Sequence, residues 1–169
     1  MAGGLDITIS LGDELERALG RAIEKGDDLT RPMAAIAEAL EVGAHQHFET
    51  ESDPMGVPWK PRRDNSDPGR KILSLSRALE QAIVREFGRD FAQVGVLRTA
   101  GPARYARIHN EGGTIRPKHK KALSFAGRLV AKVVMPKRQY LGWGNFEREE
   151  TIDILTDHLR HLFDEGAAA

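Results

Sequence analysis

Several features are scarce or missing in this 169-residue chain. It has no cysteine, which excludes disulfide bridges and thiolate metal sites and suits a reducing compartment. Aromatic residues make up only 6%, which predicts a core of aliphatic side chains. No apolar run approaches the roughly 20 residues needed to span a bilayer, and no signal peptide opens the chain. The composition therefore favours one cytoplasmic globular domain with no membrane contact.

Acidic residues are absent from the stretch 112–146, which carries 8 basic side chains. Residues 57–111 are also basic, with 11 basic against 6 acidic side chains. The two ends are acidic: residues 1–56 carry 4 basic and 12 acidic side chains, and residues 147–169 carry 2 and 7. Three interpretations are open: solvated faces of one fold, opposed surfaces of neighbouring subunits, or nucleic-acid contact by the basic middle.

The hydrophobic periodicity predicts an α+β fold in a single domain spanning 1–169. An N-terminal helical pair within 11–50, after a strand at 5–10, is followed by a small antiparallel sheet of short strands with an inserted short helix, and by a C-terminal helix. The strands are expected at 82–87, 91–96, 114–117, 122–125 and 129–135, and short helices at 71–79 and 103–110. Strands 114–117 and 122–125 would flank a basic tip. A long Pro/Gly loop occupies 52–70, and residues 165–169 are predicted to be a disordered tail.

Reactive patterns are absent from the sequence. It has no phosphate-binding loop, no nucleophile elbow and no His-Glu-x-x-His. His45 with Glu49, and His47 with Glu51, have metal-chelating spacing on the predicted helix, but the two histidines diverge by about 200° around a helix. We interpret both pairs as solvent-facing ion pairs. His109 is a candidate general base, but without a catalytic constellation a structural histidine, hydrogen-bonded to the backbone, is preferred.

Three punctuated segments stand out. They are Pro54-Met55-Gly56-Val57-Pro58-Trp59, Tyr105-Ala106-Arg107-Ile108-His109-Asn110-Glu111-Gly112-Gly113, and Pro136-Lys137-Arg138-Gln139-Tyr140-Leu141-Gly142. In this order and spacing they resemble the phage virion morphogenesis family, the tail-completion proteins of Mu-like tailed phages. The resemblance covers most of the chain. It departs at Arg77-Ala78, where the family usually has a glycine.

The resemblance implies a structural virion protein that completes the tail or neck and joins head to tail as a ring, commonly hexameric, around the DNA channel. It implies no enzyme activity and no cofactor, and the histidine spacing described above predicts no metal site. The implied partners are further copies of the chain and connector, tail-terminator or tail-tube proteins, while DNA passes without sequence-specific binding. The implied location is the virion neck or tail end, with the host cytoplasm during assembly. Two alternatives stay open: a nucleic-acid-binding module using 112–146, and a small hydrolase with His109 as base.

The candidate structural or interface residues are Trp59, Tyr105, His109, Gly112, Gly113, Lys118, Lys120, Lys121, Arg138, Tyr140 and Trp143. We expect Tyr105, Ile108 and His109 to be partly or wholly buried, and Gly112 or Gly113 to have a positive φ. We expect the loop 52–70 to be poorly anchored in a monomer. Residues 116–138 are expected to lie against acidic residues of an adjacent subunit, from 13–53 or 147–165.

Overall fold

The computed structural model describes residues 17, 20–21, 24, 27–62, 67, 69–117, 122–125 and 127–167. Helices α2 to α5 and short antiparallel strands β1 to β6 follow one another along these residues, which confirms the α+β class. The expected strand at 5–10 lies outside the described residues. Of the first helix of the expected pair, residues 17, 20, 21 and 24 are described, and all four are helical.

Helix α2 spans Thr30–Thr50, close to the predicted 31–50. The carboxylate of Asp28 accepts the backbone N–H of Thr30 at 3.0 Å where the helix begins. Glu51 ends the helix with a left-handed φ of 53°. The predicted apolar stripe faces the core, with Ile36, Ala37, Ala44 and Phe48 buried and Met33 and Leu40 partly buried. Periodic apolar residues therefore set both the helix and its orientation.

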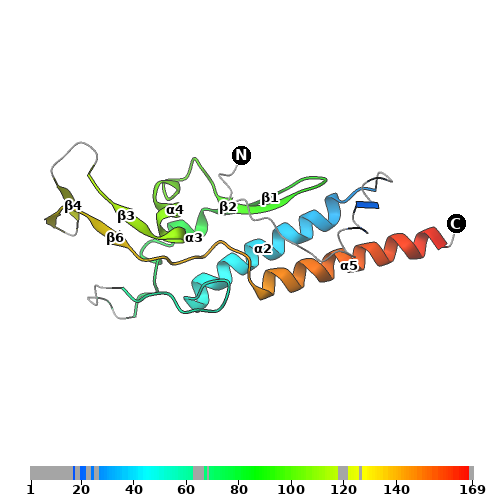
Figure 1. Cartoon of the computed structure of the whole chain (residues 1–169), viewed down its shortest axis with the longest axis horizontal. Helices are drawn as coiled ribbons and strands as arrows, with labels where there is room; N and C mark the ends of the chain where they lie inside the picture. The colour runs from blue at the N-terminus through cyan, green and yellow to red at the C-terminus, as the bar shows by residue number, and fades with distance from the viewer. Residues whose placement is uncertain are drawn as a thin grey trace.

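Strands β1 (Ile83–Phe87) and β2 (Ala92–Val96) form the predicted hairpin, with Ile83 opposite Val96. The hairpin packs against α2 (Figure 1). The short helix expected over 71–79 is reduced to α3, Ala78–Gln81. Leu73 and Arg77 have left-handed φ values of 60° and 51°. A regular helix cannot include such residues, so it begins only after Arg77.

Helix α4 spans Ala103–Glu111, as predicted, and leads into two separate ribbons. Strand β3 (Gly113–Ile115) pairs with β6 (Val133–Met135), and β4 (Leu123–Phe125) pairs with β5 (Arg128–Val130). The single strand expected at 129–135 is instead divided into β5 and β6, which pair with different strands. Gly127, with a φ of 73°, suits the tight reversal between β4 and β5.

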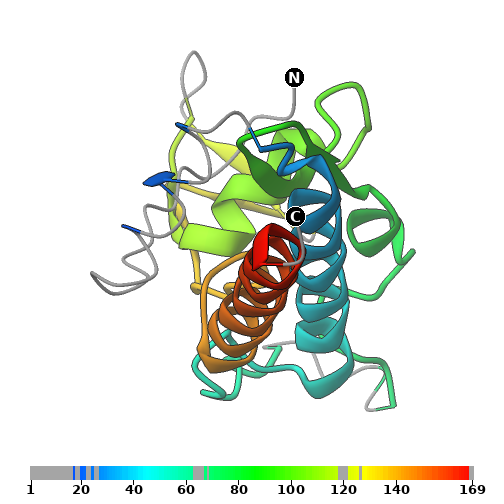
Figure 2. The same cartoon turned by 90° about the vertical axis from the view of Figure 1, so that its right-hand side faces the viewer.

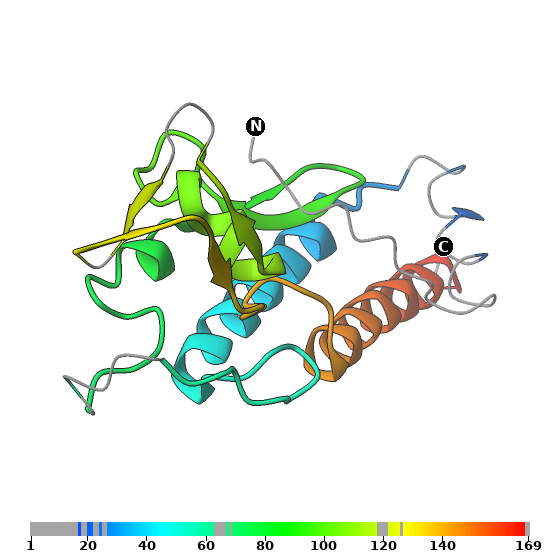
Figure 3. The same cartoon turned by 60° about the vertical axis from the view of Figure 1, so that its left-hand side comes forward.

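Helix α5 spans Asn145–Ala167 and runs side by side with α2 (Figures 1 and 2). Leu155 and Leu159, on its predicted apolar face, are buried. The helix includes residues 165–167, where the sequence predicts a disordered tail. The two ribbons extend away from the helices at the end opposite the C-terminus (Figures 1 and 3).

One contiguous core joins α2, the β1–β2 hairpin, α4 and two loops. Its members include Phe48, Trp59, Leu79, Ile83 and Tyr140. Phe48 lies between the two other aromatic rings, with ring centroids 5.6 Å from Trp59 and 5.1 Å from Tyr140. Such aromatic pairs add about 0.5–1.5 kcal/mol beyond the area they bury. The few aromatic residues are thus concentrated where the loops meet the helices, and aliphatic side chains fill the remainder.

Candidate functional site: the junction of the three loop motifs

The three punctuated segments of the sequence meet in space. The 136–142 segment connects β6 to α5 and has the end of α4 on one side and the 52–61 loop on the other. On the α4 side, the Asn110 side-chain oxygen accepts the backbone N–H groups of Tyr140 at 3.0 Å and Leu141 at 2.9 Å. The Tyr140 hydroxyl donates to the carbonyl of Ala106 at 3.1 Å. These bonds satisfy buried backbone groups in a segment with no regular structure.

The 52–61 loop is fixed to the same segment by two side chains. The indole N–H of Trp59 donates to the carbonyl of Gln139 at 3.0 Å. Arg138 donates through Nε to the Lys60 carbonyl at 3.0 Å and through Nη2 to the Pro61 carbonyl at 3.1 Å. Burial lowers the pKa of Arg138, and the positive charge of Arg62 lowers it further. Residues 52–61 are therefore anchored within the subunit.

This anchoring corrects the expectation of a poorly anchored 52–70 loop, as far as its described residues go. The sequence emphasised the prolines and glycines, but Asp53 organises the turn: its side chain accepts the backbone N–H groups of Met55 and Val57, both at 2.9 Å. Trp59 is 5% exposed. Truncating such a buried aromatic side chain costs about 3–5 kcal/mol, so the indole of Trp59 contributes substantially to holding the loop against its own subunit.

The glycine pair after α4 is required by close packing. Gly112 and Gly113 have φ values of 72° and 147°, which confirms the predicted positive φ. A Cβ atom on Gly112 would lie 2.7 Å from the backbone nitrogen of Lys137. The backbone of the 136–142 segment therefore approaches α4 as closely as glycine allows, and the backbone N–H of Arg138 donates to the His109 carbonyl at 2.9 Å.

A buried polar pair joins α2 to the start of α5. Nε2 of His47 lies 3.0 Å from Oε1 of Glu147, which is 1% exposed. The other carboxylate oxygen of Glu147 accepts the backbone N–H of Gly144 at 2.9 Å, as the third residue of a capping box does. Burial alone would raise the pKa of Glu147. The carboxylate also accepts hydrogen bonds from His47, from its own backbone N–H and from the backbone N–H of Gly144, and together these outweigh burial. The pKa of Glu147 is therefore lowered.

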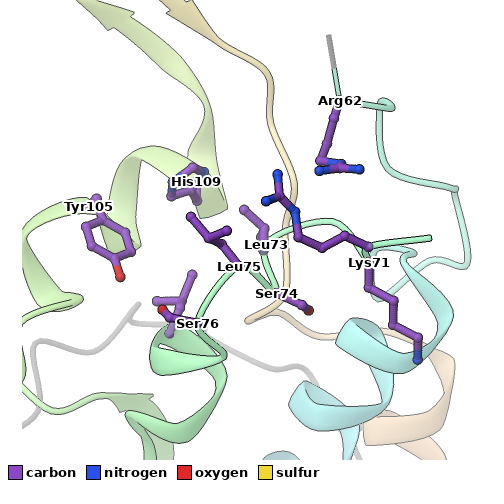
Figure 4. A pocket seen from close by; sticks show the side chains of 10 residues that line it. Arg62, Lys71, Leu73, Ser74, Leu75, Ser76, Tyr105 and His109 are labelled. Atoms are coloured by element: carbon purple, nitrogen blue, oxygen red, sulfur yellow. The ribbon is translucent and has the colours of Figure 1, made fainter. Parts of the chain in front are cut away.

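The cationic groove lies between α4 and the segment that precedes α3. It has a volume of about 360 Å³ and is lined by Arg62, Arg70, Lys71, Leu73, Ser74, Leu75, Ser76, Leu79, Tyr105 and His109. Tyr105 and His109 lie on one side and Arg62 on the other, with Leu73 and Leu75 between them (Figure 4). Burial lowers the pKa of His109, and the charge of Arg138 lowers it further, which favours the neutral imidazole.

Comparison with known proteins gives the same assignment as the motifs. Residues 12–160 match the phage virion morphogenesis family. The chain belongs to this family. It is also 28% identical over 151 residues to the putative capsid assembly protein G of Escherichia phage Mu, covering 82% of this chain and 86% of that protein. No solved structure matches the chain significantly. The protein therefore has a role in phage virion morphogenesis.

The three motifs that carried the family resemblance form one junction within the subunit. Trp59, Arg138 and Tyr140 are buried there, and Gly112 and Gly113 permit its closest backbone approach. Tyr105 is 37% exposed, with its ring edge-on to the ring of His109 at 5.6 Å. Trp143 is half-buried. Lys118, Lys120 and Lys121 lie outside the described residues.

The histidine interpretations need correction. His47 is buried against Glu147 rather than paired with Glu51 in solvent, and Glu49 pairs with Lys71 and Arg77. The Nδ1 atom of His109 is buried without a hydrogen-bond partner, so the expected side-chain hydrogen bond to the backbone is not made through this nitrogen. The backbone carbonyl of His109 instead contributes to the contact between α4 and the 136–142 segment, by accepting the N–H of Arg138.

Asn110, Glu147 and the cationic groove were not identified from the sequence. Glu147 follows Gly144 by three residues, so the capping-box spacing was a usable signal. For Asn110 the only sequence signal was its position two residues before the glycine pair. Among the described residues, no three His, Asp or Glu side chains are placed to hold a metal ion. Within the same residues, no helix combines the length and apolar character needed to cross a membrane.

Proposed function

We propose that the protein is a structural component of the neck or tail end of a tailed phage or phage-like particle. In this role it forms a ring, commonly of six copies, around the DNA channel and completes the tail so that head and tail join. Its partners are neighbouring copies and connector, tail-terminator or tail-tube proteins. The role is structural and includes no catalytic step. Family membership supports assembly, and the projecting ribbons support contact with neighbours.

The observation that carries the proposal is the exposure of apolar side chains on the two ribbons. Leu129 is 79% exposed, Val134 51% and Ile115 39%. Each ribbon has two strands, and isolated two-stranded ribbons are marginally stable in water. A neighbouring subunit that covers these side chains would remove apolar surface from water and would also stabilise the ribbons. In a ring, one such contact repeated at every subunit satisfies all copies.

The basic stretch 112–146 favours a second candidate, a nucleic-acid-binding module. Of its 8 basic side chains, the described ones other than Arg138 are exposed: they are Arg116, Arg128, Lys132 and Lys137. Arg138 is buried and donates to carbonyls of its own subunit. Within a ring the same charges would line a channel and attract DNA without reading its sequence, through phosphate contacts alone. The two functions differ in whether DNA binding or subunit contact needs the ribbons.

The proposal is tested by deleting the gene for this protein and supplying the wild-type protein or its variants during particle assembly. Without it, separate heads and tails should accumulate; normal joined particles would contradict the proposal. Leu129→Asp should prevent complementation without changing the unfolding free energy, because Leu129 is already in solvent. Leu97→Asp is the matched control, since Leu97 is 46% exposed but lies outside the ribbons. A monomer with strong, salt-dependent affinity for duplex DNA would favour the second candidate.

A further inference from the structure

The cationic groove contains positive charge that the described residues of its own subunit leave uncompensated. Nη1 of Arg62 is buried without a hydrogen-bond partner, and Nη2 of the same side chain donates to the backbone carbonyl of Asp67 rather than to a carboxylate. Among the described residues no carboxylate pairs with Arg62 or Arg70, whereas Lys71 is paired with Glu49. A buried donor without a partner costs about 1–3 kcal/mol, more when it is charged. An acceptor with negative charge would remove that cost.

The groove also has an apolar surface that a phosphate group would leave exposed. Leu75 is 76% exposed and Leu73 is half-buried, and both lie between Arg62 and the ring of Tyr105 (Figure 4). Leu73 adopts its positive φ of 60° at the same place, so the chain holds these side chains in an uncommon backbone conformation. The groove therefore fits an occupant with both an apolar side chain and carboxylates.

One exposed face of α5 has this combination. Phe146 is 37% exposed, and Glu149, Glu150 and Asp153 beside it are exposed. At 100° per residue these positions lie on the side of the helix opposite Leu155, which is buried. The α5 face, as we call these four residues, presents one aromatic ring and three carboxylates to solvent.

We propose that the cationic groove of one subunit receives the α5 face of a second copy of the chain. Phe146 then covers Leu75, and the carboxylates accept hydrogen bonds from Arg62 and Arg70. The two surfaces are different patches of one subunit, so the contact is head-to-tail and extends from copy to copy, which a ring requires. Charge complementarity fixes the register of the contact. The inference rests on the proposed ring and names a further contact between its subunits, in addition to the contact made by the ribbons.

Cross-linking tests this interface directly, because the chain has no cysteine of its own. Leu75→Cys and Phe146→Cys are introduced together, and a short bismaleimide is added to the purified protein and to assembled particles. A ladder at multiples of 18.7 kDa is the expected result. Leu75→Cys alone should give none. Leu75→Cys with Asp90→Cys, at an exposed turn outside the α5 face, should also give none.

A charge swap gives a second, independent readout. Arg70→Glu should weaken self-association about tenfold or more, because like charges then face each other. Glu149→Arg with Asp153→Arg should do the same, and all three changes in one chain should restore association. Arg98→Glu, at an exposed loop position, is the control and should have no effect. Sedimentation velocity measures association, and circular dichroism checks the fold.

The outcomes separate this inference from the proposed function. A ring that assembles normally in every charge variant and gives no ladder contradicts the interface but leaves the ring intact. Loss of DNA binding in Arg70→Glu, with unchanged association, shows that the groove holds phosphate and overturns the inference. Particles that join normally without the protein contradict the proposed function itself. A ladder together with charge-swap rescue supports the inference.

Discussion

The side chain of Asn110 holds the backbone of Tyr140 in place. Its oxygen accepts the Tyr140 N–H at 3.0 Å and the N–H of the next residue at 2.9 Å, although the two residues are 30 positions apart. Asn110 is 2% exposed and Tyr140 1%. Because the 136–142 segment has no strand partner, these bonds replace the ladder that a sheet would provide. The last turn of α4 thus anchors the segment that connects the ribbons to α5.

Replacing Asn110 by Ala should be strongly destabilising. The change leaves the backbone N–H groups of Tyr140 and Leu141 buried without an acceptor, at about 1–3 kcal/mol each. We expect a loss of about 2–5 kcal/mol in the free energy of unfolding, measured by urea denaturation. Glu111→Ala is the control: its ion pair with Arg107 is exposed, so the change should stay within about 0.5 kcal/mol. Equal stabilities of the two variants would contradict the role of Asn110.

Gly112→Ala should lower the free energy of unfolding by more than a glycine-to-alanine change at an unconstrained position does. The φ of 72° strains any side chain, and the new Cβ would meet the Lys137 backbone nitrogen at 2.7 Å. A loss on the order of 1–3 kcal/mol is expected from the backbone strain, and the contact adds to it. Gly101→Ala is the matched control, because nothing lies within 4 Å of its Cβ position. Thermal unfolding should separate the variants by several degrees; coincident transitions would mean that the close approach is absent.

Trp59→Ala should destabilise the subunit by about 3–5 kcal/mol, because it leaves a cavity beside Phe48 and removes the bond to Gln139. Val57→Ala, two residues away and 58% exposed, should change the unfolding free energy by less than about 0.5 kcal/mol. Both are measured on the monomer. A neutral Trp59→Ala would restore the idea that the 52–61 loop becomes ordered only in the assembled particle.

The buried carboxylate of Glu147 should make stability depend on pH. The folded-state pKa of Glu147 lies below its ordinary value of 4.5, so the ionised carboxylate stabilises the fold fully above that pH. This contribution is lost as the pH falls through the folded pKa. Glu147→Gln should therefore lower stability at pH 7, by about 1.5–3 kcal/mol for a charged hydrogen bond, and flatten its acid dependence. Glu149→Gln, at an exposed position, should follow the wild-type curve; a parallel curve for Glu147→Gln would contradict the assignment.

Local patterns predicted the regular elements well. The apolar stripe of α2, the turn around Gly88 in the hairpin and the glycine stop after α4 each depend on residues close in sequence, so periodicity and turn chemistry are sufficient. The partners of the ribbon strands were not predicted, because three-residue strands carry too few side chains to specify a partner. Gly127 has a φ of 73° between β4 and β5, and a backbone angle is not visible in a sequence.

The sequence identified the three loop motifs separately, but it did not predict that they meet in one junction. Trp59 and Gln139 are joined across 80 positions, and His47 and Glu147 across 100. No local pattern encodes such contacts, which depend on how the helices pack. The cationic groove has the same character: Arg62 carries no signal in the sequence, and His109 was noted only for its place in a motif; that both line one cavity with buried, unpartnered nitrogens is visible only in the structure.

A reconstruction of the assembled particle by electron cryomicroscopy tests the central claim most directly. The account predicts a closed ring of this fold at the junction of head and tail, around the DNA path, with the β3–β6 and β4–β5 ribbons covered by neighbouring protein. The 52–61 loop and the end of α4 should keep the contacts they have in the single subunit. A mature particle in which the protein is absent, or lies away from the head–tail junction as isolated copies, would contradict the account.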